Sequence, residues 1–383
     1  MPSSRAADWL TRQWRHIGVA AVLLWPLHLL MLALAWARRL GFQRGCLTSQ
    51  AVPVPVVVVG NRVVGGAGKT PTVLALIEHL RQQGWTPGVL SRGYGRQQPP
   101  DGQRDKAAAL ILDEHHQSAL SARDVGDEPW LIWRRTRAPM AVASRRAVAG
   151  RALVAAHPEI DILVCDDGLQ HLALARQIEI VVFDERGAGN GLLLPAGPLR
   201  EPINTAPGPG CTEPALVLYN ADRPSTALAG HVAHKLLLPP RPLSLWWSED
   251  RPAPESAAPD IRALRAASAQ DCWALAGIAQ PERFFQPLRA MGLSFTPCPL
   301  PDHDALDPLP WPEGLRHVIM TEKDAVKLSP DRLARQRPGT QVWVAPLAFT
   351  PVPGFWQDLD ARLAPLRPHT HHPKDTPTPW TPD

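Results

Sequence analysis

Residues 52–82 read VPVPVVVVGNRVVGGAGKTPTVLALIEHLRQ, and this stretch decides the fold. The valine-rich run at 52–59 is typical of a buried parallel strand. A glycine-rich turn at 60–68 follows, and residues 70–82 then carry apolar side chains at helical spacing until Gly84. Strand, glycine-rich loop and helix in this order are the context of a phosphate-binding loop, in which backbone N–H groups and a helix N-terminus face an anion.

The loop also carries the side chains that a nucleoside triphosphate needs. Lys69 is expected to reach the β- and γ-phosphates, and Thr70 to place its hydroxyl on Mg²⁺. The usual pattern has a glycine where this chain has Val63, and the loop instead carries Gly65-Gly66. A glycine-rich turn with a chance lysine is the alternative, and the flanking strand and helix argue against it. The predicted nucleotide-binding residues are Val63, Val64, Gly65, Gly66, Ala67, Gly68, Lys69 and Thr70.

A second strand candidate ends in two acids. Residues 162–171 read ILVCDDGLQH, an apolar run that stops at Asp166 and Asp167. Carboxylates at such a strand end hold Mg²⁺ or its water shell in phosphate-loop enzymes. Two adjacent buried acids resist joint ionisation without a cation, so a bound metal would allow both carboxyl groups to be ionised. A solvent-exposed turn is the alternative.

An apolar run precedes the first strand. Residues 17–37, IGVAAVLLWPLHLLMLALAWA, contain no charged side chain, and arginines flank them on both sides. A helix of this length covers the ~30 Å hydrocarbon core at ~1.5 Å per residue. A cleaved signal peptide would have a shorter run and a small-residue cleavage site, and a buried core helix is the other alternative. We expect a membrane anchor that either spans the bilayer or lies in its interface, since Pro26 and His28 allow a monotopic helix.

Composition narrows the class of protein. The net charge of +4 gives no argument for nucleic-acid binding. The five cysteines are odd in number and form no CxxC pair, which argues against a disulfide framework and a zinc site. A reducing compartment fits best.

Strands and helices alternate downstream of the loop, which indicates a parallel α/β sheet with helices on both faces. We expect strands at 87–91, 109–113, 141–143, 160–165, 178–183 and 215–219, and helices at 128–135 and 145–156. After about residue 222, proline-rich loops separate strands at 272–275 and 317–320 and a helix at 283–291. The fold class is therefore α/β, a P-loop NTPase-like parallel sheet with a second, smaller α/β domain and an N-terminal membrane-associated helix. The expected bounds are 1–45 for the membrane-anchoring helix, 46–222 for the P-loop domain, 223–365 for the second domain and 366–383 for a disordered tail.

Seven motifs occur along the chain in a fixed order. They are GNRVVGGAGKTP (60–71), SRGYGR (91–96), VGDEP (125–129), DDGLQH (166–171), LLPAGPLREP (193–202), PDH (301–303) and TEKDAVK (321–327). Together they resemble the tetraacyldisaccharide 4′-kinase family, from about residue 5 to 360. DDGLQH and TEKDAVK are far more specific than the glycine-rich loop.

The resemblance implies an activity. The γ-phosphate of ATP would go to the 4′-hydroxyl of a tetraacyldisaccharide 1-phosphate, which gives lipid IVA in lipid A biosynthesis. The implied cofactors are ATP and Mg²⁺. The implied partner is a lipid disaccharide presented by the membrane, with the protein at the cytoplasmic face of the inner membrane. Neither a nucleic acid nor a protein partner is expected.

Residue roles follow from the resemblance at matching positions. Asp127 in VGDEP and His303 in PDH would form a catalytic pair, and closure of the second domain over the active site would bring them together. The metal side would comprise Thr70, Asp166, Asp167 and Glu201, and the substrate side Arg92 and Gln170. Without the resemblance, Asp127 would be a helix N-cap and His303 a surface residue. Many family members have a second histidine after PDH, where this chain has Asp304, so no role is carried over to that position.

TEKD after a strand is also similar to the guanine-binding loop of GTPases. The alternative function is therefore a membrane-associated P-loop GTPase or ATPase switch. The DDGLQH context and the N-terminal apolar run favour the kinase.

Overall fold

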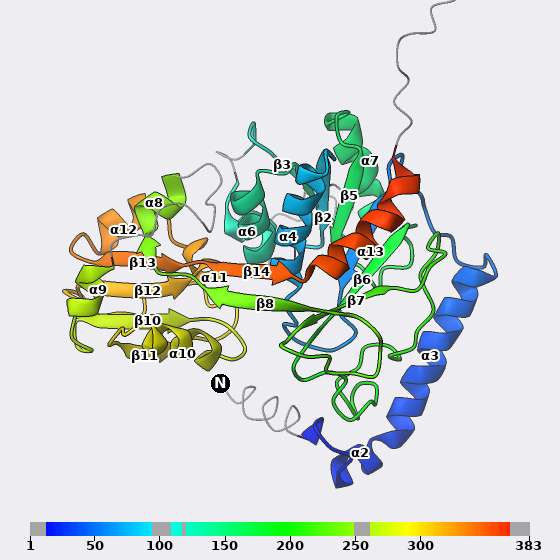
Figure 1. Ribbon diagram of the computed structural model, residues 1–383, viewed down its shortest axis with the longest axis horizontal. Coiled ribbons are helices and arrows are strands. Elements are labelled where there is room, and N and C mark those ends of the chain that lie inside the picture. The colour runs from blue at the N-terminus through cyan, green and yellow to red at the C-terminus, as the bar shows by residue number, and fades with distance from the viewer. Residues whose placement is uncertain (1–12, 94–108, 117–119, 249–260, 368–383) are drawn as a thin grey trace, which may run out of the picture.

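The computed structural model describes residues 13–93, 109–116, 120–248 and 261–367. Within these residues the strands form two sheets, and a helical arm runs along one side of the larger one (Figure 1). The expected tail lies almost wholly outside the described residues.

The larger sheet has nine strands in the order β14-β8-β7-β6-β1-β5-β2-β4-β3 among the described residues. Its strands from β8 through β4 pair in parallel, and the edge strands β14 and β3 are antiparallel to their neighbours. The bounds are β1 Val56–Gly60, β2 Pro87–Ser91, β3 Leu110–Leu112, β4 Met140–Val142, β5 Ile162–Asp166, β6 Ile178–Asp184, β7 Leu216–Asn220, β8 His231–Leu237 and β14 Leu347–Pro351. The expected parallel α/β sheet is confirmed.

Strand β1 is the fifth of the nine described strands, and helices cover both faces of the sheet around it. Val57 and Val59 share one buried cluster with α4 and α6, and Val56 and Val58 share another with α7. These helices span Lys69–Gln82, Asp127–Thr136 and Arg146–Ala156, with the short α5 at Ala122–Val125 before α6 and α13 at Pro353–Leu363 beside α4. The strand begins at Val56 rather than at the expected residue 52, because Pro53 and Pro55 have no N–H for the ladder.

The smaller sheet has five strands in the order β11-β10-β12-β13-β9 among the described residues. Its strands are β9 Arg241–Pro242, β10 Cys272–Ala276, β11 Thr296–Pro299, β12 His317–Thr321 and β13 Gln341–Ala345. The helices are α8 Leu243–Ser248, α9 Arg262–Ala266, α10 Glu282–Ala290, α11 Glu322–Ala325 and α12 Pro330–Gln336.

The two sheets divide the chain differently from the expected boundary at residue 222. β8 pairs with β7, β14 pairs with β8, and α13 packs on the larger sheet, so both ends of the expected second domain belong to the first sheet. Among the described residues, the smaller sheet and its helices lie between Arg241 and Ala345. In Figure 1, β8 and β14 lie side by side in the larger sheet and extend toward the smaller one.

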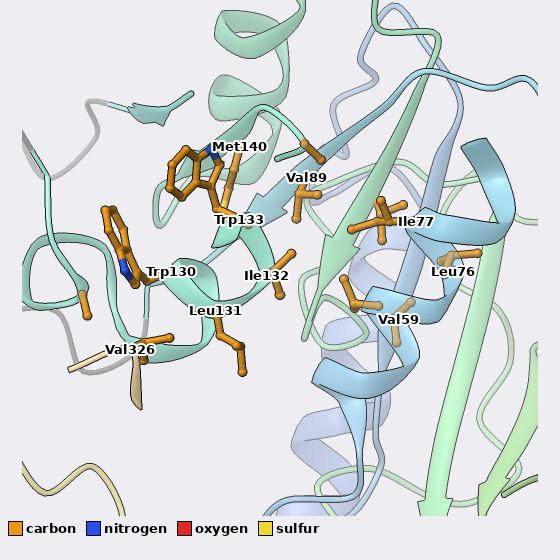
Figure 2. Packing of buried hydrophobic residues seen from close by; sticks show 14 of the residues in the cluster. Val59, Leu76, Ile77, Val89, Trp130, Leu131, Ile132, Trp133, Met140 and Val326 are labelled. Atoms are coloured by element: carbon orange, nitrogen blue, oxygen red, sulfur yellow. The ribbon is translucent and has the colours of Figure 1, made fainter. Parts of the chain in front are cut away.

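One hydrophobic cluster continues from the larger sheet into the smaller part. It includes Ile77 of α4, Leu131 and Ile132 of α6, Val326 after α11, and Val344 of β13. Figure 2 shows Val326 beside Leu131, with Ile132 directed toward α4 and the sheet. Helix α6 therefore connects the two parts by apolar packing.

The N-terminal apolar run forms two helices instead of the single one expected. Helix α2 spans Val19–Leu23 and helix α3 spans Trp25–Gln43, and the helical conformation is interrupted at Leu24 between them. The break precedes Pro26, which stands in the first turn of α3, where a missing N–H costs nothing. Within the described residues, no helix is both long and apolar enough to cross a membrane.

Candidate active site

The phosphate loop, residues 63–70, lies between β1 and α4. Helix α4 begins at Lys69, and its N-cap Gly68 has φ +90°. A Cβ at this position would lie 1.8 Å from Nδ2 of Asn220, the atom that donates to the carbonyl of Ala67 at 3.1 Å. Both the left-handed backbone and the close approach of Asn220 therefore require glycine.

The departure at Val63 has a structural reason. Val63 is 2% exposed, forms an antiparallel bridge with Leu199, and Val64 N–H donates to the carbonyl of Pro198 at 2.9 Å. The first part of the loop thus packs on the LLPAGPLREP segment, where a valine side chain adds buried apolar surface. Gly65 and Gly66 are exposed, so they form the open part of the loop.

Lys69 is held at the base of the loop. Its Nζ donates to Oδ1 of Asn61 at 3.3 Å and lies 3.4 Å from Oδ1 of Asp167. Asn61 also donates to the carbonyl of Gly65 at 3.0 Å. Asn61 was not among the predicted site residues, although it stands in the GNRVVGGAGKTP motif.

The two acids at the end of β5 are in different electrostatic states. Burial, with the charges of Glu128 and Asp167, raises the pKa of Asp166 to about 7. Burial also acts to raise the pKa of Asp167, but the charges of Lys69 and Arg200 outweigh it and lower that pKa. Arg200 Nη1 lies 3.2 Å from Asp167.

Asp166 has the features of a cation ligand. It is 4% exposed, and its Oδ1 has no hydrogen-bond partner among the described residues. A buried carboxylate oxygen without a partner is costly, and a cation would relieve that cost. The described residues contain no group of three or more His, Cys, Asp or Glu side chains that could hold a metal. Mg²⁺ needs only one or two carboxylates beside waters and phosphates.

Glu201 is engaged by the protein. Its carboxylate accepts from Arg39 of α3 at 2.9 Å and from Gln170 at 3.2 Å, and Arg62 lies 3.7 Å away. Gln170 also donates to the carbonyl of Asn61 at 3.2 Å. Glu201 and Gln170 therefore connect the N-terminal arm to the start of the phosphate loop.

Asp127 and His303 lie together, although they come from different parts of the chain. His303 Nδ1 is 3.1 Å from Oδ2 of Asp127, and Nζ of Lys327 is 3.4 Å from the same oxygen. The alternative role of Asp127 as a helix N-cap is wrong, because Gly126 is the N-cap of α6 and Asp127 is the first residue of the helix. The contact exists in this structure without further closure of the two parts.

The pair shifts the acidity of both members. The hydrogen bond with Asp127 raises the pKa of His303 above its usual value. Burial acts to raise the pKa of Asp127, but the hydrogen bond from His303 and the charge of Lys327 lower it overall. Asp127 is therefore a carboxylate at neutral pH. His303 has φ +60° and Asp167 φ +48°, values that cost non-glycine residues energy and that cluster at functional sites.

The predicted substrate residues lie near the end of β5 as well. Arg92 is exposed directly after β2. Burial, together with the charges of Arg146, Arg176, Arg38 and Arg92, lowers the pKa of His171 to about 4. His171 is thus a neutral imidazole among arginines, and the DDGLQH motif was the signal for it. Residues 94–96 of SRGYGR lie outside the described residues.

TEKDAVK does not form a guanine-binding loop here. Thr321 caps α11, and Asp324 accepts from Thr321 Oγ1 at 2.8 Å and from Gly277 N–H at 2.9 Å. Lys327 lies 3.2 Å from its other oxygen. Asp324 is fully buried and its oxygens are engaged, so the motif serves to hold Lys327 beside Asp127.

Comparisons with known proteins identify the family of the chain. The LpxK family, described as tetraacyldisaccharide-1-P 4′-kinase, matches residues 20–364. A tetraacyldisaccharide 4′-kinase of Methylibium petroleiphilum is 52% identical over 360 residues, 94% of each chain. One from Leptothrix cholodnii is 48% identical over 366 residues, 96% of this chain and 99% of that one.

A solved structure has the same fold. The "apo" form of LpxK from Aquifex aeolicus in complex with ATP superposes with a TM-score of 0.69 at 22% identity, covering 90% of this chain and 99% of the other. This match bears on the fold, and the sequence relatives bear on the family. The motifs in their expected order, the fold and these matches lead to one conclusion: the chain belongs to the tetraacyldisaccharide 4′-kinase family.

Proposed function

We propose that the protein transfers the γ-phosphate of ATP to the 4′-hydroxyl of a tetraacyldisaccharide 1-phosphate, giving a lipid A precursor. Membership of the family makes it an ATP-dependent kinase. The observation that carries the proposal is the position of the Asp127–His303 pair at the start of α6. Helix α6 packs against α4, the helix that begins at the phosphate loop, and the charge of Glu128, the next residue, contributes to the raised pKa of Asp166.

Each group of residues would have a distinct role in the proposed reaction. The exposed Gly65–Gly66 backbone and Lys69 would bind the phosphates, and the N-terminus of α4 favours their negative charge. Asp127 is an ionised carboxylate and would accept the proton of the sugar hydroxyl, with His303 orienting it. Most of the rate acceleration in phosphoryl transfer comes from positioning and charge stabilisation. The base would therefore supply a smaller part of the rate acceleration, in a site that binds both reactants.

Mg²⁺ is the proposed metal, with Asp166 as its protein ligand. The unpartnered Oδ1 and the raised pKa of Asp166 support this assignment. When bound, the ion would neutralise charge on the phosphates. Thr70 lies in the first turn of α4 and would add its hydroxyl, with Asp167 on the same strand end. Glu201 fits a positioning role better, since Arg39 and Gln170 already hold it.

The affinity for Mg²⁺ is expected to depend on pH through Asp166. Below its pKa of about 7 the carboxyl is protonated and must lose that proton to bind the ion, so affinity should rise as pH increases through 7 and then level off. Asp166→Asn should remove this dependence and most Mg²⁺-dependent turnover. Isothermal titration with Mg²⁺ and ATP between pH 6 and 8 measures it, and a wild-type affinity that is flat over this range would contradict the assignment.

We propose that the arm docks on the cytoplasmic face of the inner membrane. Its two helices expose a large apolar surface, including Leu23 at 75%, Leu30 at 54%, Leu34 at 55% and Trp36 at 65%. An exposed patch of this extent marks an interaction surface. The other side of the arm packs on the protein, where His28 accepts from Leu193 N–H at 3.0 Å and Ala21 packs against Leu192 and Ala196.

Replacing Leu23, Leu30 and Leu34 together by serine should weaken binding to phospholipid vesicles by roughly a hundredfold or more, because each leucine would lose apolar burial worth about 1 kcal/mol or more. The KM for a bilayer-presented acceptor should rise, and that for ATP should not. Leu236→Ser is the matched control, since Leu236 is 64% exposed and lies outside the arm. Co-sedimentation of the triple variant at the wild-type level would refute the interface.

The activity itself is tested with γ-labelled ATP and a tetraacyldisaccharide 1-phosphate in mixed micelles. Label should appear on the acceptor, and only when the 4′-hydroxyl is free. Label released as phosphate at the same rate with and without acceptor would favour an ATPase and overturn the proposal.

A further inference from the structure

A second cation lies against the phosphate loop. Arg186, in the first turn after β6, donates from Nη2 to the carbonyl of Gly66 at 3.0 Å. Its Nη1 lies 3.2 Å from the position that a Cβ on Gly65 would take. Gly65 has φ +94°, and the absence of a side chain there leaves room for the guanidinium. Arg186 therefore binds the carbonyl of Gly66 and lies beside the open space at Gly65.

The guanidinium is held in place from behind. Nε of Arg186 lies 3.1 and 2.9 Å from the two carboxylate oxygens of Asp184, the last residue of β6. Asp184 is completely buried, and its Oδ1 also accepts from the backbone N–H of Arg186 at 3.1 Å. With Nε fixed by Asp184, the two Nη atoms are left to face the loop. This side chain is prepositioned and would lose little conformational entropy on binding a ligand.

The position of β6 places this arginine at the nucleotide end of the sheet. β6 pairs in parallel with β1, with Gly60 opposite Val181, so the carboxyl ends of both strands lie at one edge. Ligands of parallel α/β sheets bind at that edge. A neutral carbonyl is a weaker acceptor for a guanidinium than a phosphate oxygen. The contact with Gly66 is therefore one that a polyphosphate in the loop can replace.

We propose that Arg186 is a nucleotide-binding residue that exchanges the Gly66 carbonyl for phosphate oxygens of the ATP bound in the loop. It would supply a second positive charge beside Lys69 from within the same chain, as cis arginines do in other phosphoryl-transfer enzymes. The identity of the nucleotide rests on the proposed function, and the contact with a polyphosphate rests on the geometry.

Arg283 of α10 provides a matched control. Its Nη2 lies 3.5 Å from Oδ2 of the same Asp184, and it also forms an ion pair with Glu185. Arg283→Ala removes one cation from the carboxylate that holds Arg186, and the Arg186 contact to the loop remains. A general disturbance of Asp184 would affect both variants, and loss of a phosphate contact would affect only Arg186.

Isothermal titration of the full chain in detergent with ATP, ADP and AMP tests the proposal without an acceptor. Arg186→Ala should weaken ATP binding by about tenfold or more, as expected for a charge-assisted hydrogen bond. AMP affinity should stay within about twofold of wild type, because AMP has no β- or γ-phosphate to lose a contact. Arg186→Lys should show an intermediate loss, and Arg283→Ala should bind ATP like wild type.

Three outcomes would overturn the proposal. They are unchanged ATP affinity in Arg186→Ala, an equal loss for ATP and AMP, which would make Arg186 a support of the loop, and an equal loss in Arg283→Ala. Arg186→Gln keeps the test open if the alanine variant does not fold. Since no acceptor is present, wild-type protein that binds ATP but fails to phosphorylate the disaccharide would refute the proposed function and leave this inference intact.

Discussion

Lys69→Ala is expected to reduce turnover at saturating ATP by roughly 10²-fold or more. Lys69 stands at the first position of α4, directly after the glycine that the loop geometry requires. Its ammonium is the group expected to meet the β- and γ-oxygens, where charge develops during transfer. Removing one such contact typically costs several kcal/mol in the transition state.

The contact between Lys69 and Asp167 provides a control for the measurement. Lys69 is also a partner of Asp167, at 3.4 Å, so its loss should raise the pKa of Asp167 as well. Lys69→Arg keeps that charge and is the matched control for the electrostatic part of the effect. Single-turnover kinetics with thermal melts of each variant separate chemistry from folding. Near wild-type turnover in Lys69→Ala would remove the loop from the mechanism.

Local pattern was sufficient to predict the centre of the larger sheet. The expected strands at 87–91 and 178–183 and the helix at 70–82 agree with β2, β6 and α4 to within a residue at each end. The apolar run of β6 ends at an acid, Asp184, and α4 lies between Gly68 and Gly84. Such signals lie within short stretches of sequence, so they can be recognised without the structure.

The edge of the sheet depends on contacts that the sequence does not display. β8 has a mixed burial pattern with three exposed residues in a row, and its partner β14 lies more than a hundred residues later. This pairing brings the chain back from the smaller sheet to the larger one, and no local hydrophobic periodicity in the sequence predicts it. The boundary expected at residue 222 missed it for this reason.

The candidate site was partly predictable, because motifs are local in sequence and the contacts between them are not. Motif positions singled out Asp127, His303 and the acids of β5 as candidates, but they did not predict which cations contact the carboxylates. Lys327 reaches Asp127 from the end of a helix capped by Thr321, and Arg39 reaches Glu201 from the N-terminal arm. Such partners are defined by three-dimensional packing and could be assigned only from the structure.

The second large effect concerns the Asp127–His303 pair. Each single alanine variant should lose about 10²-fold or more in kcat, in the range expected for a general base. The double variant should lose little more than the worse single one, because residues that act as a unit are strongly non-additive. The KM for ATP should change little, since neither residue belongs to the phosphate loop.

A double-mutant cycle in kcat measures this coupling, with melts of all variants to exclude unfolding. Asp304→Asn is the matched control, because Asp304 follows His303 directly and its side chain, among the described residues, accepts a hydrogen bond only from Leu306 N–H, at 2.8 Å. It should retain wild-type kcat. Losses that simply add, or a His303 variant with full activity, would remove the pair from the mechanism and make Asp167 the next candidate base.

The pH profile separates a catalytic pair from a structural contact. Asp127 must be ionised to accept a proton, so kcat should fall on the acid side as pH drops through its lowered pKa. Removing His303 deletes the hydrogen bond that opposes the effect of burial, and only Lys327 then keeps the pKa of Asp127 low. The acidic limb of the profile should therefore move to higher pH in His303→Ala. If His303 served only to hold the chain, its loss would lower kcat or stability by the same factor at every pH, and the limb would stay where it is in the wild type.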